Sequence, residues 1–128
     1  MENKKTILVV EDEISLLNAL RDKLARENFA VLEAKNGEEG LEVALREHPD
    51  LILLDIVMPK MDGMTMLRKL RSENEWGKSV PVVILTNLTS ADDQRNRDIT
   101  ELEPAYYLVK TDLKLDDVVA KVKERLGE

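Results

Sequence analysis

The sequence contains no cysteine, so disulfide bonds, thiolate metal sites and thiol chemistry are excluded. Basic residues are the minority, 19 against 26 acidic residues, and the net charge at pH 7 is −7. This balance argues against a bare nucleic-acid-binding protein, because phosphate contacts require a basic face. There is also no apolar run long enough to cross a bilayer and no signal peptide at the N-terminus. We therefore expect a soluble cytoplasmic protein that does not contact membranes.

What the chain does contain is enough apolar sequence for one hydrophobic core. Hydrophobic residues make up 43% of the 128 residues, which favours a globular fold over disorder. No linker, repeat or low-complexity stretch divides the chain, and its last helical pattern ends at Leu126, close to the final residue. We expect a single domain over residues 1–128, with no output domain.

Five strand-like segments alternate along the chain with five helical patterns. The strands are expected over Thr6–Val10, Ala30–Ala34, Leu51–Leu54, Val80–Leu85 and Ala105–Val109. The first, third and fourth are almost continuous in Ile, Leu and Val, which is typical of a parallel sheet covered on both faces. Alternating strands and helices predict a right-handed, doubly wound α/β domain.

Apolar stripes at helical spacing are expected to cover this sheet. The stripes are Ile14, Leu17, Leu20 and Leu24; Leu41, Ala44 and Leu45; Met66, Leu67 and Leu70; and Leu115, Val118, Val119, Val122 and Leu126. The expected helix N-caps are Asn36, Asp62, Ser90 and Asp112. The polar segment Ala91–Glu103 is interpreted as a further helix. His48 is expected to end the second helix, and Trp76 to lie in a loop and cover apolar surface.

Several polar side chains follow the ends of predicted strands. Glu11 and Asp12 follow the first strand, Asp55 the third, Thr86 the fourth and Lys110 the fifth. In doubly wound sheets, sites form at the carboxyl ends of the strands, where strand order reverses. We therefore expect these side chains to meet at one edge of the sheet.

A cluster of three carboxylates favours a divalent cation. Two carboxylates ~4 Å apart repel each other by roughly 4 kcal/mol at an effective dielectric constant of ~20. Magnesium suits such a site, because it takes oxygen ligands and needs few carboxylates besides water and a phosphate group. Acidic residues after strands are also found as solvated helix caps. Asp55 argues for a site instead, because it is the only charge in the apolar run from Leu51 to Met58.

In combination these residues resemble the response-regulator receiver domains of two-component signalling. The resemblance covers about residues 6–126 and is carried by the acidic pair Glu11–Asp12, by Asp55 within LLDIVMPKMDG, by Thr86 and by Lys110. It implies a flavodoxin-like three-layer sandwich of five strand–helix units. The five-stranded parallel sheet of that fold has the strand order 2-1-3-4-5.

The resemblance also implies a role for each residue of the pattern. Asp55 is the expected phosphoacceptor, which takes a phosphoryl group from a histidine kinase. Mg²⁺ is expected on Asp12, on Asp55, on the backbone carbonyl of Val57 and, through water, on Glu11. Thr86 and Lys110 are expected to hold the phosphoryl oxygens, and Thr86 also acts with Tyr107 as a conformational switch. The physics of phosphoryl transfer, an in-line nucleophile and neutralised oxygens, agrees with this set.

The implied function is signalling by protein contact rather than enzymatic turnover. Phosphorylation would change the face formed by the Ala91–Glu103 helix, the Ala105–Val109 strand and the last helix, and so control a downstream protein. The implied partners are a histidine kinase or phosphotransfer protein and a downstream protein target, without direct nucleic-acid contact. The chain is expected to be a monomer or a weak, phosphorylation-dependent dimer, with weak autodephosphorylation.

The sequence departs from the family pattern at several positions around the site. Thr111 follows Lys110 where the family has a cis proline, Asn87 replaces a very small residue, and Glu103-Pro104 replaces a glycine-containing turn. Val57 and Leu88 are apolar at positions that often carry polar side chains. We hypothesise slow hydrolysis of the phosphoryl group, because apolar walls hinder an attacking water. A phosphoaspartate lifetime of seconds in the purified protein would contradict this.

Two other function classes remain open at this point. A haloacid-dehalogenase-like phosphatase would need a second acid after Asp55, but Val57 stands at the position where that acid is required. A phosphorylation-independent pseudo-receiver, which keeps the fold as an interaction module, is compatible with Asn87 and Thr111. Turnover of a phosphate ester would favour the phosphatase. Absence of any labelling of the protein with a phosphoryl group would favour the pseudo-receiver.

Overall fold

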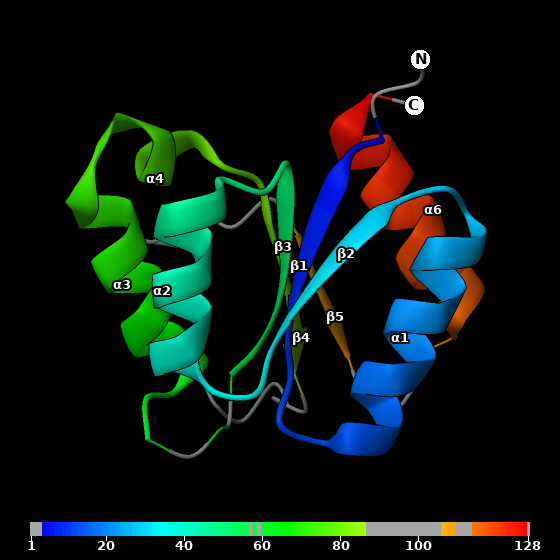
Figure 1. The fold of residues 1–128 in the computed structure, drawn as a ribbon, viewed down its shortest axis with the longest axis horizontal. Helices are drawn as coiled ribbons and strands as arrows, with labels where there is room; N and C mark the ends of the chain where they lie inside the picture. The colour runs from blue at the N-terminus through cyan, green and yellow to red at the C-terminus, as the bar shows by residue number, and fades with distance from the viewer. Residues whose placement is uncertain (1–3, 57, 59, 87–105, 110–113, 128) are drawn as a thin grey trace.

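A parallel sheet of five strands forms the middle layer of the protein (Figure 1). The computed structural model describes residues 4–56, 58, 60–86, 106–109 and 114–127, with the backbone alone at 86 and 106–109. The strands are β1 (Thr6–Val10), β2 (Ala30–Ala34), β3 (Leu51–Asp55), β4 (Val82–Thr86) and β5 (Tyr106–Val109). They lie in the order β2-β1-β3-β4-β5, and every neighbouring pair is parallel. The predicted fold class and strand order are confirmed.

Helices cover both faces of the sheet and complete the three layers. Figure 1 shows α1 (Ile14–Arg26) and α6 (Leu115–Leu126) on one face, and α2 (Gly37–Glu47), α3 (Gly63–Glu73) and α4 (Glu75–Ser79) on the other. Within the described part of the chain, every helix is too short or too polar to span a bilayer.

Two hydrophobic clusters, one on each face, hold the layers together. Side chains alternate along each strand, so neighbours point to opposite faces of the sheet. Ile52 and Leu54 of β3 pack with α2 and α3, whereas Leu51 and Leu53 pack with α1 and α6. All four side chains are fully buried. The nearly continuous apolar sequence of the central strands is therefore explained by burial on both sides.

Two predicted helix caps are confirmed and one is wrong. Asn36 accepts a hydrogen bond from the Glu39 amide at 2.8 Å, and Asp62 accepts one from the Thr65 amide at 2.8 Å. Asp112 is not the cap of the last helix, because α6 begins at Leu115 and Lys114 occupies its N-cap position. Asp112 itself, Ser90 and the helix expected over residues 91–103 lie outside the described residues.

The structure also corrects smaller parts of the prediction. β4 begins at Val82 instead of Val80, after Pro81, whose ring nitrogen has no hydrogen to donate to a neighbouring strand. Ile14 does not belong to the buried stripe of α1: it opens the helix and is 49% exposed. The loop expected around Trp76 is the short helix α4, which the Asn74 side chain caps with a 2.7 Å hydrogen bond from the Gly77 amide. Trp76 does cover the core, as expected, and stacks on His48 with 4.3 Å between ring centroids.

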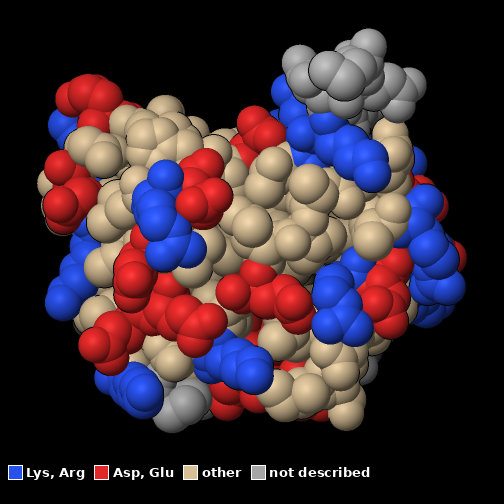
Figure 2. Space-filling view, viewed as in Figure 1, with Lys and Arg blue, Asp and Glu red and all other residues tan. Residues whose placement is uncertain are grey.

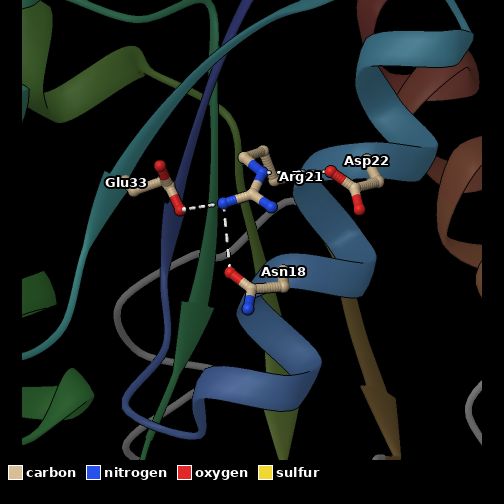
Figure 3. Close-up of polar contacts among 4 residues, drawn as sticks. All are labelled: Asn18, Arg21, Asp22 and Glu33. Carbon is tan, nitrogen blue, oxygen red and sulfur yellow. Dashed lines mark hydrogen bonds and ion pairs between the residues drawn. The ribbon is translucent and has the colours of Figure 1, made fainter.

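Polar contacts join α1 to the edge strand β2. Arg21 donates from Nη1 to Glu33 Oε1 at 3.3 Å and to Asn18 Oδ1 at 3.0 Å, and from Nε to Asp22 Oδ1 at 3.1 Å (Figure 3). The hydrogen bond from Arg21 to Asp22 raises the pKa of the Arg21 guanidinium above its ordinary value. Charged side chains of this kind are a common protection of a sheet edge against pairing with other chains.

Candidate functional site

Two neighbouring strands carry acidic residues to the same edge of the sheet. Val10, the last residue of β1, pairs with Leu54 of β3. Glu11 and Asp12 follow directly, and Asp55 is the final residue of β3. The parallel register therefore sets these carboxylates side by side at the carboxyl ends of the strands, at the lower edge of the sheet in Figure 1.

The three carboxylates form a compact cluster, as the sequence predicted. One oxygen from each of Glu11, Asp12 and Asp55 lies within 4.8 Å of the others. Glu11 is fully buried and Asp55 is 3% exposed, while Asp12 is open to solvent. The cluster thus has a buried floor and one accessible side.

Backbone hydrogen bonds hold the segments that carry these acids. The Glu11 amide donates to the Ala34 carbonyl at 3.0 Å, and Glu11 Oε1 accepts from the Glu13 amide at 3.1 Å. The Gly63 amide donates to the Ile56 carbonyl at 2.7 Å, which closes the loop between Asp55 and α3. Both acid-bearing segments are therefore held by hydrogen bonds to neighbouring main-chain groups.

The residues present fit a hard divalent cation. Each pair of carboxylates at this separation repels by about 3–4 kcal/mol at an effective dielectric constant of ~20, and a cation removes that cost. Around an octahedral magnesium ion, adjacent oxygens lie about 3 Å apart and opposite oxygens about 4 Å apart. Three carboxylates that each offer an oxygen within 4.8 Å of the others are therefore near enough to share one ion. The exposed side at Asp12 leaves room for the waters that magnesium retains.

The backbone places one further predicted position, Thr86, at this edge. Thr86 is the last residue of β4 and follows Leu85, the partner of Asp55 in the sheet. Val109, the last residue of β5, pairs with Thr86 and directly precedes Lys110. Lys110 and Val57 lie outside the described residues, as do Asn87, Leu88, Glu103-Pro104 and Thr111. Tyr107 is located in β5 by its backbone alone.

A feature of the site that the sequence analysis missed is the contact between Gly37 and Met61. The Gly37 amide donates to the Met61 carbonyl at 3.0 Å, so the start of α2 touches the loop after Asp55. The signal available in the sequence was an Asn-Gly pair between a strand and a helix, which indicates a cap and a turn but not the partner of that turn.

The fold and the acid cluster together define a doubly wound α/β domain with three carboxylates at the carboxyl edge of its sheet, a group that could hold a metal ion. The sequence model of the response regulator receiver domain family matches residues 7–123 of this chain. The chain therefore belongs to that family. Receiver domains act as phosphoacceptor regulators, bind Mg²⁺ at an acidic pocket and interact with histidine kinases and downstream targets. The family membership does not favour the pseudo-receiver alternative.

Curated relatives are longer proteins that share this domain. The chain is 39% identical over 106 residues to the transcriptional regulatory protein RstA of Escherichia coli, which covers 83% of this chain and 42% of that protein. It is 43% identical over 84 residues to the transcriptional regulatory protein ResD of Bacillus subtilis, covering 66% of this chain and 33% of that protein. The chain thus spans less than half the length of these relatives.

Solved structures confirm the fold over nearly the whole chain. A CheY-like receiver domain protein from Methanospirillum hungatei has a TM-score of 0.88 at 26% identity, covering 98% of this chain and 95% of that one. The receiver domain of the sensor histidine kinase PA1611 from Pseudomonas aeruginosa has a TM-score of 0.85 at 25% identity, covering 98% of this chain and 100% of that one. The latter has a magnesium ion coordinated in its active-site cleft.

Proposed function

We propose that Asp55 is the phosphoacceptor of this receiver domain. The observation that carries the proposal is the cluster in which Asp55, 3% exposed at the end of an apolar strand, lies within 4.8 Å of two further carboxylates. Burial of a carboxylate costs free energy, and proximity to two further carboxylates adds to that cost. A cation and a phosphoryl group at Asp55 would give this arrangement a chemical role.

We propose Mg²⁺ as the cation of this site. Asp12 and Asp55 would bind it directly and Glu11 through water, while the backbone carbonyl of Val57 completes the protein ligands. When bound, the ion supplies positive charge that stabilises the charge developing on the transferred phosphoryl group. The magnesium ion in the related receiver domain of PA1611 supports the choice of metal.

In the proposed reaction, the Asp55 carboxylate attacks the phosphorus atom of a phosphohistidine. A bond forms between a carboxylate oxygen and phosphorus, the phosphorus–nitrogen bond breaks, and the histidine nitrogen keeps the electron pair and takes a proton. Thr86 and Lys110 hold the phosphoryl oxygens, which is the electrostatic stabilisation that phosphoryl transfer requires. The donor is a histidine kinase or phosphotransfer protein.

The output would be a change of surface rather than catalysis on an external substrate. Thr86 moves toward the phosphoryl group and Tyr107 follows, so the face that includes β5 and α6 changes its preferred partner. We propose that the protein is cytoplasmic and signals to a protein target. It would be a monomer or a weak, phosphorylation-dependent dimer. Hydrolysis of the phosphoryl group would be slow, with weak autodephosphorylation.

Direct nucleic-acid binding is not part of the proposal. The net charge is −7, and Figure 2 shows acidic and basic side chains interspersed over the visible face instead of a continuous basic patch. The relatives named as transcriptional regulators are more than twice as long as the part that matches this chain. The role in transcription that their names state therefore does not assign DNA binding to the receiver domain itself.

The proposal is tested by intact-mass spectrometry after incubation with a small phosphodonor and magnesium. We expect one added phosphoryl group on the wild-type chain, and none without magnesium or in Asp55→Asn. Asp50→Asn is the matched control, because Asp50 directly precedes the other end of β3, and it should be labelled like the wild type. Labelling of Asp55→Asn, or no labelling of the folded wild type, would contradict the proposal.

A further inference from the structure

The short turn between β2 and α2, residues Ala34–Gly37, contacts both segments that carry the acid cluster. At one end the Ala34 carbonyl accepts a hydrogen bond from the Glu11 amide at 3.0 Å. At the other end the Gly37 amide donates to the Met61 carbonyl at 3.0 Å. In the sheet, β1 lies between β2 and β3, so the turn must reach past the end of β1 to make the second contact. The turn therefore bridges the two acid-bearing segments.

Gly37 leaves no space for a side chain at this bridge. A Cβ atom there would lie 2.2 Å from the Met61 carbonyl oxygen and 3.1 Å from that of Asp62. Both atoms belong to the main chain and cannot move aside by a change of rotamer. Separating the Cβ and the Met61 oxygen from 2.2 to 3.0 Å, the shortest tolerated contact, requires a shift of about 0.8 Å.

A shift of the loop at Met61 reaches Asp55, because the loop is closed on both sides. Gly63, at the start of α3, donates its amide to the Ile56 carbonyl at 2.7 Å. A Cβ on Gly63 would lie 2.2 Å from the Asp55 carbonyl oxygen, so α3 presses directly on the end of β3. The start of α3 and the end of β3 thus have little freedom to absorb a displacement.

The turn itself is anchored on the α2 side. The Asn36 side chain caps the helix at the Glu39 amide, and the Asn36 carbonyl accepts from the Gly40 amide at 2.9 Å. Val43 and Ala44 are buried in the core and fix the rest of α2 against the sheet. The helix side of the turn is therefore held in place, so the loop after Asp55 takes up part of the displacement that a substitution at Gly37 forces.

We propose that the Ala34–Gly37 turn is a positioning element of the metal site, and that this role depends on the absence of a side chain at Gly37. The turn sets the distance between the Glu11–Asp12 segment and the loop after Asp55. This inference rests on the proposed function only in taking Mg²⁺ as the ion. Magnesium demands near-ideal octahedral geometry, so an error approaching an ångström between its ligands weakens binding.

The test is the magnesium affinity of the full chain, measured by titrating MgCl₂ into ¹⁵N-labelled protein and following amide chemical shifts. We expect Gly37→Ala to weaken Mg²⁺ binding by about tenfold or more, the usual effect of losing a supporting contact around a metal site. Gly40→Ala is the matched control on the same helix, because the three atoms nearest to its Cβ would belong to side chains, those of Val10 and Met66. We expect the Mg²⁺ affinity of the Gly40→Ala variant to stay close to that of the wild type, even if the two proteins differ in melting temperature.

Each outcome of the titration has a separate meaning. Equal affinities of wild type and Gly37→Ala would overturn the positioning role and leave the magnesium site intact. An equal loss in Gly40→Ala would also overturn it, because general destabilisation would then explain the effect. Absence of saturable binding to the wild type would overturn the magnesium site itself. The titration needs no phosphodonor, so failure of the phosphoacceptor proposal is recognised independently by mass spectrometry.

A measurement on the wild type keeps the inference testable if Gly37→Ala does not fold. Saturating MgCl₂ should slow hydrogen exchange at the Glu11 and Gly37 amides together, because ligand binding at the cluster suppresses opening of the bridge. Unchanged exchange at both amides under saturating magnesium would overturn the proposal.

Discussion

Lys60 has a strained backbone in the loop that follows Asp55. Its φ is 66°, in the left-handed region, and its side chain is exposed. That conformation costs a residue with a side chain about 1–2 kcal/mol, and a glycine adopts it without this penalty. Strain of this kind beside a site indicates that the surrounding structure determines the path of the loop. Here the contacts of Gly37 and Gly63 with the same loop provide that constraint.

We predict that Lys60→Gly raises the free energy of unfolding by about 0.5–1 kcal/mol, because relief of strain exceeds the extra entropy of glycine in the unfolded chain. Urea denaturation measures the effect. Lys69→Gly is the matched control: Lys69 is an exposed lysine inside α3, and its replacement should lower stability by about 1 kcal/mol. Equal destabilisation by both substitutions would contradict the assignment of strain to Lys60.

Two ion pairs connect the helices on one face of the sheet. Lys123 Nζ lies 3.0 Å from Glu27 Oε1, and Lys23 Nζ lies 2.8 Å from Asp116 Oδ1, so both pairs join α1 to α6. The hydrogen bond from Lys123 lowers the pKa of Glu27 below its ordinary 4.5. The hydrogen bond from Lys23 likewise lowers the pKa of Asp116 below its ordinary 3.8. The α1–α6 contact is therefore sensitive to acid.

The pH dependence of this contact has a definite sign. A carboxyl group whose pKa is lower in the folded protein stabilises the fold above its ordinary pKa, and this contribution is lost as pH falls through the folded value. We predict that the melting temperature of the wild type exceeds that of Glu27→Gln at pH 7. The difference should shrink as pH falls below about 4.5. Glu73→Gln, which removes an exposed carboxylate from α3 on the other face of the sheet, is the control. A gap that stays constant or widens in acid would contradict the prediction.

At the scale of elements, periodicity predicted most of what is seen. The strands β1 and β2 have the predicted bounds, and α1, α2, α3 and α6 carry the expected apolar stripes. Ile14 was wrongly assigned to a stripe, because helical spacing alone does not show that the first residue of the helix is left exposed. The short helix α4 was missed because five residues are too few for a periodic pattern, although Asn74 is a suitable cap.

At the scale of the whole molecule, the acid cluster was predictable and its supports were not. Glu11 and Asp12 are far from Asp55 in the chain, but both acidic segments lie at the end of a buried strand, and parallel strands end at a common edge. The bridge from Gly37 to Met61 is a contact between main-chain atoms. Such a contact leaves no side-chain pattern in a sequence beyond the glycine itself, so it required the three-dimensional structure.

The central claim is that Asp55 is the one carboxylate of the cluster that accepts the phosphoryl group. Borohydride reduces an acyl phosphate to an alcohol and leaves free carboxylates unchanged, so it marks the acceptor at its own position. Peptide sequencing by mass spectrometry after phosphorylation with magnesium and borohydride treatment locates that residue. We predict homoserine at position 55 and unmodified residues at Glu11 and Asp12. Reduction at Glu11 or Asp12, with position 55 still aspartate, would contradict the account.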